Sequence, residues 1–68
     1  MDTPVYIIEA DNPDGTYSRV AQAGIWQEAE HELRKAAHRE GVNPSGNARN
    51  LSVWHIPSAT CLATWQPT

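Results

Sequence analysis

Histidine is the residue type in this chain that most directly suggests metal chemistry. His31 and His38 lie in a segment with helical spacing, where seven residues would separate them by about 10 Å along the axis. One ion cannot bind both side chains at that distance. Glu28 and His31 form a Glu-x-x-His pair, but di-iron bundles use such pairs only with matching ligands from other helices. We therefore expect solvated helix residues and no metal site.

A thiol and an imidazole can form a nucleophile and its base. Cys61 is the single cysteine, which excludes an internal disulfide and a thiolate-rich zinc site. The register we expect for the last hairpin pairs Ile56 with Cys61 and points His55 and Cys61 to opposite faces, too far apart to share a proton. A shift of one residue would bring them to one face. Cys61 is predicted to be a small core residue.

Carboxylates gather near the first turn, where Glu9, Asp11 and Asp14 resemble part of a calcium loop. Pro13 and the short connection leave no room for the ligand spacing and the terminal bidentate glutamate of such a loop. The chain also has no glycine-rich phosphate loop, no nucleophile elbow and no pair of carboxylates predicted to be buried. We expect no enzyme activity and no cofactor.

The elements that must position these residues begin with a strand predicted over residues 4–10. It is apolar on both alternating faces, as a central strand would be. Residues 11–15 carry the proline, aspartate and glycine of a tight turn. A returning strand is predicted over residues 16–22, with Tyr17 and Val20 as its larger apolar members.

A helix is predicted over residues 25–40. Its apolar positions recur every three or four residues on one face, and they are Trp26, Ala29, Leu33, Ala36 and Ala37. Acidic residues come early and basic ones late, which complements the helix dipole. Gly41 and Pro44 end the pattern. Residues 43–47 form a polar, turn-rich loop that we expect to be mobile.

The last hairpin is predicted from strands over residues 51–56 and 60–66. The expected register pairs Trp54 with Ala63 and places Trp65 on the same face. Leu51, Val53 and Leu62 are expected on the other face. The fold class is therefore α+β, a single domain over residues 1–68 with ββαββ order, in which one amphipathic helix packs on one face of a four-stranded antiparallel sheet. The pattern is compatible with more than one strand order and with either sheet face being the open one.

The net charge and the composition limit the classes of partner that we expect. The net charge is −3, and Arg19 and Arg49 stand alone, so a concentrated basic face for nucleic acid is not expected. No apolar run is long enough for a bilayer, and the first residues lack the pattern of a signal peptide. We expect a cytoplasmic protein, in the cytoplasm of the host cell if the gene is carried by a phage, with no membrane partner.

Acidic and aromatic side chains remain as candidates for binding a protein. Large amphipathic rings are enriched at interface hot spots, although Trp26 and at least one strand tryptophan are expected to fill the core. Acidic groups on the first hairpin and early helix would favour a basic target. The predicted partner-binding residues are Glu9, Asp11, Asp14, Tyr17, Glu28, Glu30, Glu32, Trp54 and Trp65.

The sequence resembles, in its overall pattern, small phage and mobile-element proteins of the anti-CRISPR type. The pattern consists of the apolar strand at residues 5–8, the Asp14-Gly15 turn, the alanine-rich helix over residues 23–37 and a tryptophan-bearing last hairpin. The resemblance implies a stoichiometric inhibitor that binds a Cas or other host defence complex and occludes its nucleic-acid-binding or partner surface. It carries over no functional residue.

Two alternative functions belong to other classes of protein. The chain could be a homodimeric assembly or accessory protein of a phage or bacterium that buries its open sheet face against a copy of itself. It could also bind single-stranded nucleic acid weakly by stacking bases on Trp54, Trp65 and Tyr17.

Overall fold

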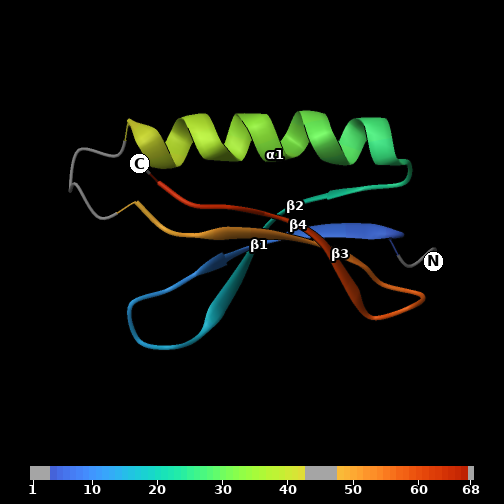
Figure 1. Ribbon diagram of the computed structural model, residues 1–68, viewed down its shortest axis with the longest axis horizontal. Coiled ribbons are helices and arrows are strands. Elements are labelled where there is room, and N and C mark those ends of the chain that lie inside the picture. Colours follow the sequence, from blue (N-terminus) through green and yellow to red (C-terminus); the bar gives the residue numbers. More distant parts are fainter. Residues whose placement is uncertain (1–3, 43–47, 68) are drawn as a thin grey trace.

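The computed structural model describes residues 4–42 and 48–67. In chain order its elements are β1 (Tyr6–Asp11), β2 (Tyr17–Ala23), α1 (Trp26–Gly41), β3 (Leu51–His55) and β4 (Thr60–Trp65) (Figure 1). The α+β class and the ββαββ order are confirmed, and every element begins and ends within two residues of its predicted bounds. The loop predicted to be mobile, residues 43–47, lies outside the described residues.

The sheet has the order β2-β1-β3-β4, and all neighbouring strands are antiparallel. β1 and β3 pair at the centre and join the two hairpins. The prediction that the first strand is central is confirmed, because Ile7 and Ile8 are both buried although they point to opposite faces. α1 packs across β2, β1 and β3 on one face of the sheet (Figure 1). We call this the covered face and the other the open face.

The core lies between α1 and the covered face. Ile8, Leu51 and Val53 are its largest fully buried side chains, and burial of each contributes roughly 1.5–3 kcal/mol. Alanines fill the remaining positions on both layers, namely Ala10, Ala23, Ala29 and Ala36. Small side chains let the helix lie close to the sheet. The predicted helix stripe is confirmed for its alanines and Leu33. Trp26 instead keeps 37% of its surface exposed. Its ring meets that of Tyr6 edge-on, with the ring centroids 5.7 Å apart.

The turn between β1 and β2 forms where the sequence predicts it. Asn12 donates its backbone N–H to the Thr16 carbonyl at 2.8 Å, and Gly15 adopts a positive φ of 87° that its missing side chain makes inexpensive. Asp14 Oδ1 accepts hydrogen bonds from the Thr16 hydroxyl at 2.6 Å and the Thr16 backbone N–H at 3.0 Å. These bonds lower the pKa of the Asp14 carboxyl, the hydroxyl bond most.

The predicted register of the last hairpin is wrong. Trp54 pairs with Cys61 and Val53 with Ala63, so β4 carries one extra residue, Leu62, at a bulge. Cys61 keeps the predicted face, that of Trp54, but this is the open face, so Cys61 is exposed rather than part of the core. Leu62 does not join Leu51 and Val53 in the core, since it is 47% exposed.

Trp54 and Trp65 lie on opposite faces as a consequence of the same register. Trp65 pairs with Leu51 and packs partly buried against the core on the covered face. The expectation that at least one strand tryptophan fills the core is met by Trp65, and the expectation that both share a face is corrected. Within the described part of the chain, no helix has the length and apolar character needed to cross a lipid bilayer.

Candidate functional site

A buried ion pair holds the end of α1 to the segment before β3. Glu40 is 7% exposed and receives three hydrogen bonds from Arg49. The backbone N–H and Nε donate to Oε1 at 2.9 and 3.0 Å, and Nη2 donates to Oε2 at 2.9 Å. The remaining guanidinium nitrogen, Nη1, donates to Asn12 Oδ1 at 3.0 Å. The Arg49 side chain is thus engaged by an acid and an amide of the same chain, a pairing that the sequence did not predict.

Asn12 extends this pair into the first turn. Its Nδ2 group donates to the Thr16 hydroxyl at 3.0 Å and to the Ser18 hydroxyl at 2.8 Å, while its Oδ1 accepts from Arg49. We call Glu40, Arg49 and Asn12 the polar clamp. Hydrogen bonding to Arg49 lowers the pKa of the Glu40 carboxyl, and the same contact raises the pKa of Arg49. Because each clamp group is already bonded within the protein, we assign the clamp a structural role.

A signal for Glu40 was present in the sequence. The apolar positions Trp26, Ala29, Leu33 and Ala36 continue by the same three-and-four spacing to position 40. A carboxylate at the next core position of a helical stripe must be paired. Arg49 gave no comparable signal, because it lies in a segment without periodicity.

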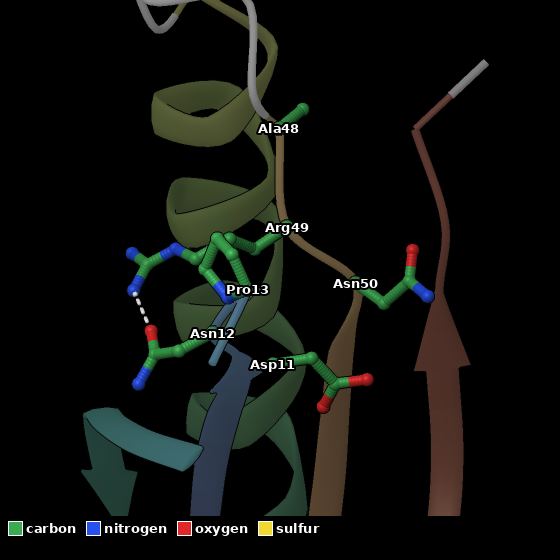
Figure 2. A pocket seen from close by; sticks show the side chains of 6 residues that line it. All are labelled: Asp11, Asn12, Pro13, Ala48, Arg49 and Asn50. Carbon is green, nitrogen blue, oxygen red and sulfur yellow. Dashed lines mark hydrogen bonds between the residues drawn. The ribbon is translucent and has the colours of Figure 1, made fainter. Parts of the chain in front are cut away.

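Figure 2 shows a shallow pocket beside the clamp, with Asn12 and Arg49 reaching toward each other. The side chains of Asp11 and Asn50 extend the other way, toward β4. The two backbones are held together because the Asp11 N–H donates to the Asn50 carbonyl at 3.0 Å. The clamp thus fixes the backbone of two residues whose side chains are directed away from it.

The open face is the surface on which these side chains lie. Ile7 is only 4% exposed there, although within the described residues no element packs over that face. Its cross-strand neighbours are Gln22 on β2 and Trp54 on β3, so these side chains must supply its cover. The Trp54 indole is oriented by its own hydrogen bond, in which Nε1 donates to the Ser52 hydroxyl at 3.1 Å.

A hollow runs along this face between β1, β3 and β4. Asp11 and the 66%-exposed Tyr17 are cross-strand partners at one end, and Trp54 and Cys61 are partners nearer the other. Hydroxyls and amides line the space between and around them. We call this the open-face hollow, lined by Asp11, Tyr17, Asn50, Leu51, Ser52, Trp54, Cys61, Thr64, Trp65 and Gln66.

The structure separates the predicted partner-binding residues into two groups. Glu9, Asp11, Tyr17 and Trp54 share the open face, and Asp14 lies at the adjoining turn. Trp65 packs against the core on the covered face, although the residue also borders the hollow. The helix carboxylates lie in the layer on the other side of the sheet, so one flat partner cannot contact both groups. Those carboxylates are Glu28, Glu30 and Glu32.

Two helix carboxylates are also engaged locally. Glu30 lies 4.0 Å from Arg34, and Glu32 lies 3.5 Å from Lys35. Exposed pairs of this kind contribute about 0.3–0.5 kcal/mol each, but they reduce the negative field available to a partner. A stripe of basic residues follows on α1, comprising His31, Arg34, Lys35, His38 and Arg39, which the sequence analysis did not single out as a surface.

Catalytic and metal chemistry have few candidates. His55 and Cys61 point to opposite faces, as the sequence predicts, although through a different register. The His55 Nδ1 atom lies 2.7 Å from the Ser58 hydroxyl at the surface. Within residues 4–42 and 48–67, no three side chains of the metal-binding types gather in one place.

Comparison of the chain with protein-family models, with curated proteins and with solved structures finds no match.

Proposed function

We propose that this chain is a non-catalytic protein-binding domain that uses its open face. The observation that carries the proposal is the set of large side chains on that face, Ile7, Trp54 and Tyr17, over which no described element packs. Tyr17 is 66% exposed, and an aromatic ring of this kind gains most when a partner excludes water from it.

The charges of the open face favour a basic partner surface. Glu9 and Asp11 lie on this face and Asp14 lies at its end, whereas Arg19 is the basic residue opposite Glu9. Hydrogen bonding to Thr16 lowers the pKa of Asp14 and so extends the acidic range over which that carboxyl is charged. An acidic rim around an aromatic centre steers a basic surface toward it and disfavours an oligonucleotide.

The finer form of the proposal is an inhibitor of the phage type. Such a protein would cover a basic surface that a host defence complex uses for nucleic acid, and it would need neither a cofactor nor a catalytic residue. The open face supplies both elements of such a cover, an aromatic centre and an acidic rim. The resemblance to anti-CRISPR proteins motivates this form.

Affinity capture from a bacterial host tests the binding function. The wild-type chain is compared with Tyr17→Ala and Trp54→Ala, and Arg34→Ala on the opposite layer serves as control. We expect one captured protein to be retained by the wild type and Arg34→Ala and lost with the two open-face variants. Equal capture by all four chains contradicts the proposal. Tyr17→Ala removes an exposed ring, so its result does not depend on folding.

A plating assay tests the inhibitor form. Expression of the chain in cells with active CRISPR immunity should restore plaques of a targeted phage. The double variant Glu9→Gln/Asp11→Asn should reduce this effect, whereas the triple variant Glu28→Gln/Glu30→Gln/Glu32→Gln should not. The reverse order of the two variants would move the target-binding surface to α1, and no restoration by the wild-type chain would reject inhibition of that system.

A further inference from the structure

We infer that the open-face hollow receives an arginine side chain of the partner. This inference rests on the proposed function and names the group that the site recognises. The combination on which it stands is a carboxylate, Asp11, whose cross-strand partner is the exposed ring of Tyr17 at one end of a hollow with an indole, Trp54, in its wall.

The carboxylate end provides two kinds of contact for a planar cation. Asp11 and Tyr17 pair directly across β1 and β2, and cross-strand Cβ atoms lie about 4.5–5.5 Å apart. A guanidinium can accept this geometry, since it forms two parallel hydrogen bonds to a carboxylate while its plane stacks on an aromatic ring. An ammonium is a compact, strongly hydrated charge, so it can pair with the carboxylate but cannot form the two parallel hydrogen bonds or stack as a plane on the ring.

The length of the hollow suits a long side chain. Asp11 lies opposite Asn50, and Ser52 and Trp54 follow along β3 at two-residue steps. Each step spans roughly 7 Å, because a strand rises about 3.3 Å per residue. An arginine whose charged group meets Asp11 can therefore lay its aliphatic stem past Ser52 toward the indole. The Trp54–Ser52 hydrogen bond already holds that indole along the strand.

Neighbouring groups complete the site. The side-chain amide of Asn50 extends to the same side as Asp11 (Figure 2), and Thr64 and Gln66 line the opposite wall from β4 and the residues after it. Carbonyl and hydroxyl oxygens of this kind can accept the guanidinium N–H groups that the carboxylate leaves free. The polar clamp fixes the backbone from which Asp11 projects, through the adjoining Asn12 and the strand bond from Asp11 to Asn50.

A titration followed by nuclear magnetic resonance tests the inference on the full chain. The probes are the blocked amino acids N-acetyl-arginine methylamide, its lysine counterpart and its citrulline counterpart, which has the arginine shape without the charge. We expect the arginine probe to shift the Trp54 indole N–H signal in a saturable way, with a dissociation constant in the millimolar range. The lysine probe should bind more weakly, and citrulline should leave the signal in place.

Two variants of equal charge change locate the site. Asp11→Asn should weaken the arginine probe about tenfold, the effect of losing a charge-assisted hydrogen bond. Glu28→Gln removes an exposed carboxylate from α1, on the other side of the sheet, and should leave binding within about twofold of the wild type. Equal binding of citrulline and arginine, equal binding of lysine and arginine, or an equal loss in the two variants would each overturn the assignment.

The result is separable from that of the proposed function. Failure of the arginine probe together with Trp54-dependent capture of a protein partner removes the arginine site and leaves protein binding standing. If the arginine probe binds but no protein is captured in a Trp54-dependent way, the proposed function is rejected instead. The hollow would then be a cation site that does not bind a protein partner.

Discussion

The two faces of the sheet bury their central isoleucines by different means. Ile8 lies on the covered face, where α1 excludes water with small side chains packed at close range. Ile7 lies on the open face, where cover comes from strand neighbours such as Trp54 in the same layer. Both residues are buried to a similar degree, at 0% and 4% exposed. Equal burial therefore has two origins, since a second packed layer covers Ile8 and side chains of the same layer cover Ile7.

The largest expected effect is the loss of stability when each of the two isoleucines is shortened. Ile8→Ala should lower the free energy of unfolding by about 3–4 kcal/mol, since the cavity lies between two packed layers. Ile7→Ala should cost about 1–2 kcal/mol, because the open-face side chains can collapse over the gap. Urea denaturation of both variants measures the difference. Equal losses would mean that the open face is as rigid as the covered one.

The next largest loss of stability is expected when the polar clamp is disrupted. Arg49→Ala leaves Glu40 buried without its partner and should destabilise the domain by about 2–3 kcal/mol. This is below the roughly 3–5 kcal/mol of a fully buried pair, because the Arg49 side chain keeps 28% of its surface in water. Asn12→Ala should cost less, about 1 kcal/mol, since it removes neutral hydrogen bonds.

Thermal or urea unfolding provides the measurement for the clamp, and Arg34→Ala is its matched control. Arg34 forms an exposed pair with Glu30, so its removal should change stability by no more than about 0.5 kcal/mol. Similar losses for the two arginine variants would show that burial of Glu40 adds nothing to the pair.

The smallest expected effect is the pH dependence of stability. The folded-state pKa of Glu40 is lowered by Arg49, so the stability it contributes is complete above the ordinary value of 4.5 and is lost as pH falls through the folded value. Asp14 acts in the same direction through Thr16. Urea midpoints between neutral pH and pH 3 should fall less steeply in Glu40→Gln than in the wild type. Parallel curves would contradict the assignment.

Much of the fold was predictable because periodicity and turn residues act locally. The apolar run in residues 5–8, the turn at Asp14-Gly15, the helical stripe from Trp26 to Ala37 and the alternation in residues 51–56 and 60–66 located all five elements. The register of the last hairpin was not predictable in this way. A bulge at Leu62 inserts one residue, and one residue moves every following side chain to the other face.

The candidate site was predictable only in part for the same reason. Tyr17, Trp54 and the first-hairpin carboxylates were identified from residue type, and the structure brings Asp11, Tyr17 and Trp54 around one hollow. Asn50, Ser52 and Thr64 joined them through strand order and register, which no local pattern encodes. The clamp likewise depends on Arg49 meeting Asn12 across 37 positions of the chain.

The buried alanines between α1 and the sheet limit the positions at which this domain tolerates a larger side chain. Ala10 and Ala29 are fully buried, and enlarging a buried side chain in a packed core costs about 1–3 kcal/mol. A domain of this length has a total stability of roughly 3–10 kcal/mol, so a few such enlargements would exhaust it. Variation in side-chain size is therefore confined to the outer surface of α1 and to the open face. Substitutions can therefore accumulate on the open face without the helix moving from its place.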